Sequence, residues 1–276
     1  MKNVLKMEIR RAFGNYCFFA ALTVGLFLVL WHFFQFSIPY LTSQEVYVNG
    51  YKIYPHNVYE RCMLGDIYGL QVHIFALCLP VLAALPFGGS AYEDMKSGYR
   101  QNVLTRTDRK VYFTAKFIAA FISGAFVVLI PAAVDFMANM CLYPTTRGDI
   151  TTGWDGAAVG GMFPEFYYAH PFLFTLLICS FIGLFGGIYA VMALSVSWLA
   201  SNVFIVLLFP VLVQTFYNFT CSLADASSWQ TTCYFNLAQS ERYMRVWKPL
   251  CVATGFLVLS LVLYILMARK KDMLNG

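Results

Sequence analysis

The sequence predicts an all-α integral membrane protein with six transmembrane helices and with both termini in the cytoplasm. Hydrophobic residues make up 59% of the 276 residues and charged residues only 12%, about half the charged share of a soluble domain. This composition excludes a soluble fold and a disordered chain. The apolar stretches are long and continuous rather than alternating, which is typical of spanning helices and not of a transmembrane β-barrel.

Stretches that lack Asp, Glu, Lys and Arg place the helices along the chain. Each can hold the roughly 20 residues of a spanning helix, and the stretch over 166–224 can hold two, joined by a polar turn at 195–202. We expect a single domain over 1–276, with outer loops at 37–69, 139–170 and 220–248. The expected spans cover about 16–36, 70–91, 111–138, 171–194, 203–219 and 249–268.

The distribution of basic residues sets the orientation. With both termini inside, 13 of the 19 Lys and Arg residues fall in the N-terminal segment, in the loop and helix start over 92–116, and after the last span. Cytoplasmic loops of membrane proteins carry this excess. The net charge of +5 is therefore explained by topology and by attraction to the anionic lipid leaflet, and no nucleic-acid partner is needed.

The N-terminal segment over 1–14 has its own pattern. Lys2, Lys6 and Arg10 recur every fourth residue, whereas Leu5 and Ile9 fall on another face. This pattern predicts a short amphipathic helix lying at the membrane interface. The alternative is a basic flank that only marks orientation.

Common catalytic motifs are absent from the sequence. There is no phosphate-binding loop, no His-Glu-x-x-His and no Gly-x-Ser-x-Gly, so we expect neither an enzyme nor a chain that binds a cofactor or metal itself. The polar residues expected within or at the ends of spans are His73, Asp135, Gln214 and Asn218. Such residues are candidates for a transport pathway, and His73 with Asp135 leave open a membrane enzyme or a secondary transporter.

Cysteines and small residues give weaker signals. Cys221 and Cys233 in the last outer loop are a candidate disulfide, and free thiols are the alternative. Small residues at 183, 186, 187, 190 and 193 of the fourth span predict a close approach of another helix.

The loop that follows the second span is the most informative stretch. It opens with an acidic pair and continues with closely spaced basic residues, and this organisation suggests a docking surface. The segment resembles the cytoplasmic coupling segment of ABC-2 type transporter permeases, in which a Glu is followed by Ser-Gly, a Leu-rich turn and an Arg-Tyr-Lys pattern. Thr107 stands where the family often has Pro. The matching residues are Glu93, Ser97, Gly98, Leu104, Asp108, Arg109, Tyr112 and Lys116.

The resemblance implies a function in export. Permeases of this family are bacterial cell-membrane subunits that pair with a second permease chain, identical or different, and with ABC ATPase subunits that carry ATP and Mg²⁺. The coupling segment would be 92–110, and an amphipathic, peptide-like or lipid-like substrate would cross by ATP-driven alternating access. The residues expected to contact or position the ATPase are Glu93, Gly98, Arg100, Leu104, Arg106 and Arg109.

Overall fold

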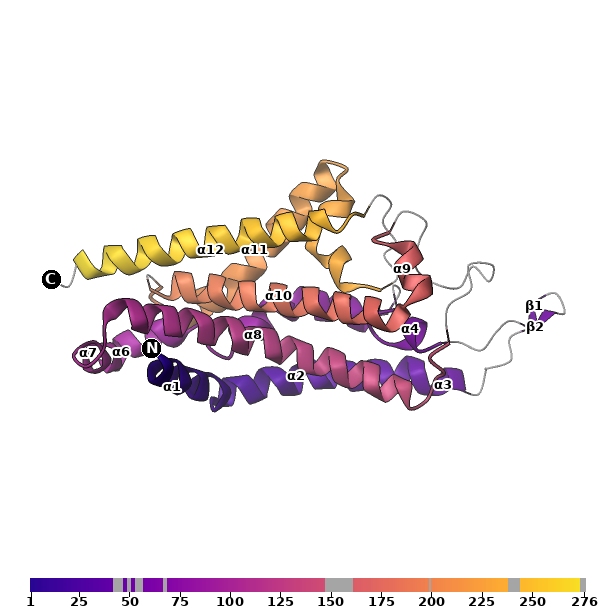
Figure 1. The fold of residues 1–276 in the computed structure, drawn as a ribbon, viewed down its shortest axis with the longest axis horizontal. Coiled ribbons are helices and arrows are strands. Elements are labelled where there is room, and N and C mark those ends of the chain that lie inside the picture. The colour runs from indigo at the N-terminus through magenta and orange to yellow at the C-terminus, as the bar shows by residue number, and fades with distance from the viewer. Residues whose placement is uncertain are drawn as a thin grey trace.

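The computed structural model is an elongated bundle of helices (Figure 1). It describes residues 1–41, 47–48, 51–52, 57–66, 69–146, 161–198, 200–237 and 244–273. Among these described residues, five helices are long and apolar enough to cross a membrane, as an all-α, multi-pass membrane protein requires. They are α2 (Tyr16–His32) with its extension η1 (Phe33–Ser37), α8 (Arg109–Met140), α10 (Pro171–Ser197), α11 (Val203–Leu223) and α12 (Trp247–Met273).

Shorter elements connect these helices. A two-residue antiparallel hairpin pairs Tyr47 with Lys52. The short helices near the N-terminal half are α1 (Lys2–Phe13), α3 (Ile38–Leu41), α4 (Val58–Arg61), α5 (Leu70–Ala84), α6 (Ser90–Lys96) and α7 (Tyr99–Leu104). The remaining elements are β1 (Tyr47–Val48), β2 (Tyr51–Lys52), α9 (Pro164–Ala169), η3 (Ser227–Trp229) and η4 (Thr231–Phe235).

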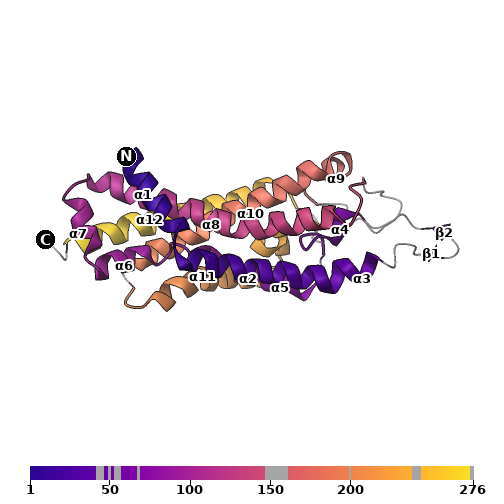
Figure 2. The same cartoon turned by 90° about the horizontal axis from the view of Figure 1, so that it is seen from below.

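The two ends of the bundle differ. Helices α1, α6 and α7 lie at the same end as the C-terminal end of α12, whereas α3, α4, α9 and the hairpin lie at the other (Figures 1 and 2). The three basic regions recognised in the sequence therefore gather at one end. We call this the basic end, and the opposite one the loop end.

The residues at the starts of several spanning helices favour a helix N-terminus. The Asn15 side chain accepts a hydrogen bond from the amide of Cys17 at 3.2 Å, and Asn202 accepts one from Phe204 at 3.1 Å. Both residues satisfy amides that have no partner in the first turn of a helix. Helix α10 instead begins with Pro171, which has no amide hydrogen to satisfy. The turn between α10 and α11 falls within the expected 195–202.

Helix α5 is shorter than the second span expected over 70–91. It ends at Ala84 after 15 residues, about 22 Å of helix, and turns over 85–89 lead into α6. Pro86 removes a helical donor, and the Gly88–Gly89 pair weakens the helix further. A Cβ atom on Gly88 would lie 2.8 Å from the Cβ of Ala193, so the turn also packs closely on α10.

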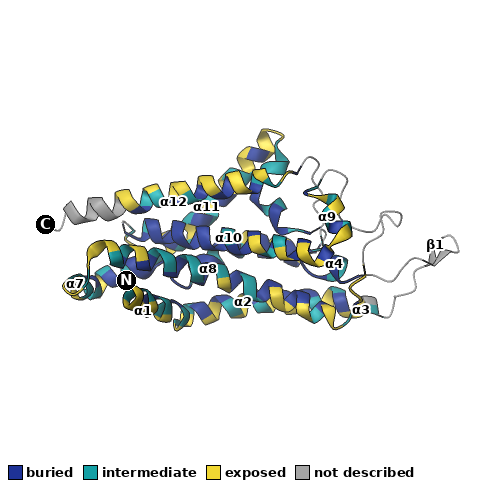
Figure 3. Cartoon of the chain, in the orientation of Figure 1, coloured by how far each residue is buried: buried dark blue, intermediate teal, exposed yellow. Residues whose placement is uncertain are grey.

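Helix α10 is the most buried spanning helix and forms the centre of the bundle (Figure 3). It crosses α8 at glycines on both helices. A Cβ atom on Gly186 would lie 2.8 Å from the carbonyl oxygen of Gly124, and one on Gly124 would lie 2.3 Å from the Cβ of Ala190. Of the small residues expected to permit a close approach, those at 183, 186, 187 and 190 contact α8, and the one at 193 contacts the turn before α6.

Helices α2 and α11 expose large apolar side chains. Phe27 is 63% exposed on α2, and Leu212 and Phe216 are 66% and 73% exposed on α11. In water such exposed apolar faces would promote aggregation. On a membrane-spanning bundle they are the expected surface toward lipid or toward another spanning chain.

The glycine contact generates the first prediction. Gly186→Leu should lower the free energy of unfolding by about 2–3 kcal/mol, because the side chain has no space against the α8 backbone. SDS titration of the purified protein in mixed micelles measures the change. Gly255→Leu is the matched control, since no atom lies within 4 Å of a Cβ placed there. Equal stability of the two variants would contradict the close crossing.

Candidate coupling and pathway sites

Four charged side chains and a tyrosine meet at the basic end. Arg11 of α1 donates from Nη2 to Oδ1 of Asp94 on α6 at 2.7 Å, and from Nη1 to Glu8 at 3.1 Å. Lys116 of α8 donates to Oδ2 of Asp94, and the Tyr112 hydroxyl donates to the same oxygen at 2.5 Å. We call this group the ionic cluster. It joins three elements that are far apart in the sequence.

Burial makes the ionic cluster interdependent. Lys116 and Glu8 are fully buried, and Asp94 is 1% exposed. A buried charge is tolerated only with a well-placed partner, and the cluster supplies two cations and two anions. Burial acts to raise the pKa of Asp94, but Lys116, Arg11 and the Tyr112 hydroxyl together lower it below its ordinary value. Asp94 therefore stays ionised at neutral and mildly acidic pH, and its stabilising contribution is lost only as the pH falls through that lowered pKa.

Gly98 forms the joint between α6 and α7. It has φ +72°, in the left-handed region that favours glycine. The preceding Ser97 closes α6, and its hydroxyl donates to the carbonyl oxygen of Glu93 at 2.8 Å. The sharp reversal lets the two short helices lie together at the tip of the basic end (Figure 1). A side chain at position 98 would strain this backbone.

The residues expected to couple to an ATPase divide into two groups. Glu93, Arg106 and Arg109 are exposed. Arg100 is 8% exposed, and its guanidinium carbon lies 5.5 Å from the ring centre of Trp198. Leu104 packs against the apolar cluster that contains Trp198. Arg100 and Leu104 therefore pack α7 against the bundle, and their side chains are not exposed at its surface.

Three of the four candidate pathway residues share one cavity. His73 of α5 and Gln214 and Asn218 of α11 line a space of about 590 Å³ that η4 also borders. The Gln214 side-chain amide donates to the carbonyl oxygen of Ala76 at 3.0 Å, and Asn218 accepts from the amide of Thr231 at 2.9 Å. We call this space the outer cavity.

Asp135 lies elsewhere, in a separate buried network near the loop end. Its Oδ2 accepts from the amide of Met63 at 2.7 Å, and its Oδ1 accepts from Asn139 at 3.3 Å. Asn139 in turn accepts from Ser37 at 2.7 Å. Asp135 does not line the outer cavity. The structure thus does not bring Asp135 and His73 together in one site, and it uses Asp135 to hold the segment after α4 against α8.

Several polar pairs have no signal in the sequence. His32 lies 3.2 Å from Asp66, and Gln71 donates to Gln35 at 2.6 Å. Within the ionic cluster, Asp94 was recognised only as part of an acidic helix start. Its distance along the chain from Arg11, 83 residues, leaves no local pattern that could reveal the pair.

The candidate disulfide is not formed. The Cys233 thiol instead approaches the carbonyl oxygen of Ser227 at 3.6 Å, and Cys221, at the end of α11, is buried as a thiol. Of the two alternatives left open by the sequence, this structure contains the thiols.

Comparison with known proteins gives no relative. A scan against family models, a search of curated proteins and a search of solved structures each find no match to this chain.

The ionic cluster generates the second prediction. Asp94→Asn should lower the free energy of unfolding by about 3–5 kcal/mol, because it leaves the Lys116 ammonium buried without a carboxylate partner on α6. Replacing both residues, Asp94→Asn with Lys116→Met, should recover much of this loss. SDS titration measures Asp94→Asn, Lys116→Met and the double variant. Additive effects of the two substitutions would show that the pair is not coupled.

Proposed function

We propose that this chain is the membrane-spanning permease subunit of an ABC exporter and that an ABC ATPase subunit docks on α6 and α7. The ionic cluster is the observation that carries the proposal. Through it, the segment that resembles a coupling segment is bonded directly to the start of a spanning helix. A force applied to α6 therefore reaches α8 through buried charged contacts rather than through a flexible loop.

In the proposed orientation the basic end faces the cytoplasm. The gathering of both terminal regions with α6 and α7 supports this assignment, together with the excess of Lys and Arg. Helix α1 would lie at the interface, since Lys2, Lys6 and Arg10 are exposed whereas Glu8 and Ala12 are buried. The exposed Glu93, Arg106 and Arg109 form the docking surface, and ATP with Mg²⁺ would bind to the partner.

Helix α5 completes the six spans of the proposal. Its 15 residues are shorter than the roughly 30 Å hydrocarbon core requires, but the apolar turn over 85–89 extends the hydrophobic segment toward α6. Helix α5 packs against α2, α8, α10 and α11, so its neighbours satisfy much of its surface. A short, shielded span is compatible with a bilayer where tilted neighbours accommodate the mismatch.

Transport would use two arrangements of the helices. Closure of the ATPase subunits moves α6 and α7, the ionic cluster transmits this movement to α8, and the glycine crossing transmits it to α10. The chain needs only different contacts in the two states, because ATP bound by the partner supplies the energy. This route is compatible with alternating access in the bacterial cell membrane.

A second permease chain would complete the path. The exposed apolar faces of α2 and α11 support pairing there, and the resemblance implies the same helices. The outer cavity opens beside α11 and combines His73, Gln214 and Asn218 with the aromatic side chains Phe75 and Phe235. This mixture suits an amphipathic, peptide-like or lipid-like substrate better than a small ion, which requires charged or oxygen-lined sites.

Charge reversal on the docking surface provides the third prediction. Arg109→Glu should weaken association with the ATPase about tenfold or more, because it places a carboxylate on a basic surface. Copurification of the ATPase with the tagged permease measures the effect, and membrane levels should be unchanged. Arg245→Glu makes the same charge change in the last outer loop and serves as control. An unaltered complex would contradict the docking assignment.

Cysteine crosslinking provides the fourth prediction. On a background without native cysteines, Phe27→Cys and Leu212→Cys should form crosslinks between two permease chains, because both positions are exposed on the proposed pairing faces. Val29→Cys and Val206→Cys lie on the same helices but are buried, so they should form none. Crosslinking over 20–34 and 205–218 at helical spacing would support the pair. Intrachain products alone would mean that this interface is wrong.

A further inference from the structure

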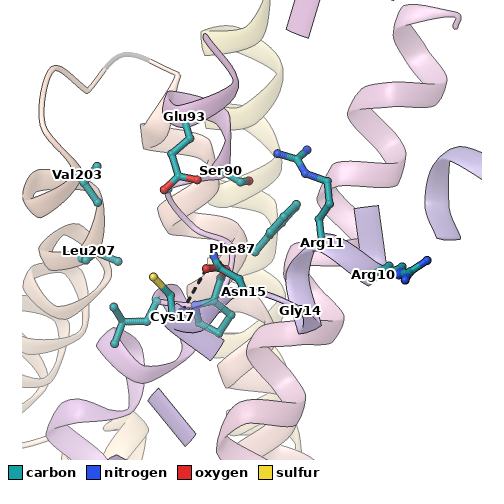
Figure 4. A pocket seen from close by; sticks show the side chains of 13 residues that line it. Arg10, Arg11, Gly14, Asn15, Cys17, Phe87, Ser90, Glu93, Val203 and Leu207 are labelled. Carbon is teal, nitrogen blue, oxygen red and sulfur yellow. Dashed lines mark hydrogen bonds between the residues drawn. The ribbon is translucent and has the colours of Figure 1, made fainter. Parts of the chain in front are cut away.

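A second cavity of about 360 Å³ opens at the basic end (Figure 4). It lies between the turn joining α1 to α2, the turn joining α5 to α6, and the first turns of α11. We call it the inner cavity. In the proposed orientation it lies at the level of the cytoplasmic headgroups, because Gly14 and Asn15 begin the first span there.

One side of the inner cavity is acidic and polar. Glu93 turns its carboxylate into the space, and Ser90 lies beside it on α6 (Figure 4). Ser90 is only 5% exposed, yet its hydroxyl has no hydrogen-bond partner among the described residues. Burying a polar group without a hydrogen-bond partner costs free energy. A ligand that forms a hydrogen bond with this hydroxyl would remove that cost. Beside a carboxylate, the fitting ligand group is a cation that donates hydrogen bonds.

The rim on the side of α1 is basic. Arg11 runs along the edge of the cavity and is held there by Asp94. Arg10 turns outward (Figure 4) and forms no ion pair with any described residue. Because Arg11 is already neutralised by Glu8 and Asp94, the Arg10 guanidinium is the group that favours a phosphate at the rim. The cavity therefore offers an anionic inner site and a cationic outer one.

The remaining wall is apolar. Val203 and Leu207 of α11 and Cys17 of α2 line it. The exposed residues Phe204 and Leu208 of α11, with exposed fractions of 71% and 52%, follow next to it along the helix. A hydrocarbon chain leaving the cavity would therefore stay in contact with apolar side chains.

We propose that the inner cavity binds the headgroup of an aminophospholipid with the chemistry of phosphatidylethanolamine. The ammonium lies on Glu93 and Ser90, the phosphate lies toward Arg10, and an acyl chain follows Val203 and Leu207. The negative protein group thus faces the positive ammonium of this zwitterionic lipid, and the positive protein group faces its negative phosphate. The site requires the chain to be in a membrane but does not depend on an ATPase partner.

The test is lipid titration of the purified full chain, followed by native mass spectrometry. Phosphatidylethanolamine should bind at one molecule per chain and about tenfold more tightly than phosphatidylcholine of the same acyl composition, because a trimethylammonium group donates no hydrogen bonds to Glu93 and Ser90. Ser90→Ala should weaken phosphatidylethanolamine binding several-fold and leave phosphatidylcholine binding unchanged. Glu93→Gln should weaken the binding of both cationic headgroups, and phosphatidylethanolamine the more strongly because it also loses a hydrogen bond. Asp108→Asn, at an exposed acid outside the cavity, should change neither.

A variant that fills the inner cavity tests the site without changing any charge. A Cβ atom on Gly89 would meet only Val203, at 3.6 Å, so Gly89→Leu should be tolerated and should fill the space between α6 and α11. It should abolish the site for both lipids. Equal binding of the two lipids, unchanged binding by Glu93→Gln, or tighter binding of phosphatidylglycerol than of phosphatidylethanolamine would each overturn the proposal.

Discussion

The burial of the Lys116 ammonium is the constraint on which the rest of the structure depends. A fully buried cation in an apolar bundle requires a carboxylate at bonding distance, and Asp94 is that carboxylate. Because Asp94 belongs to α6, the requirement fixes α6 against α8. Because Asp94 also binds Arg11, the same requirement fixes α1. One electrostatic condition thus determines the arrangement of the whole basic end.

Close packing extends this constraint into the membrane-spanning part. Helix α8 carries Lys116 near its start and Gly124 about two turns later, where it crosses α10 at Gly186 and Ala190. A second connection runs from α7, where Arg100 lies over Trp198 at the end of α10. Helices α6 and α7 are therefore attached to both central helices.

Glu93 is shared by the proposed docking surface and the proposed lipid site. It belongs to the exposed surface proposed to dock an ATPase, and its carboxylate also turns into the inner cavity. A bound ammonium there would neutralise Glu93 and change the charge that the partner encounters. Lipid composition and docking would then influence each other reciprocally, as linkage requires for two ligands that share one group.

Hydropathy alone determined that this protein is a helical membrane protein, and it placed the long helices and the turn near 195–202, because every backbone polar group in lipid must be satisfied within a helix. Charge pattern alone identified the loop after α5. Only the tertiary structure decided that α5 ends at Ala84, that His73 shares a cavity with Gln214 while Asp135 does not, and that Lys116 is buried on Asp94. These features depend on contacts between side chains of different helices. Hydropathy and charge pattern are local along the chain and do not identify the residues that make such contacts.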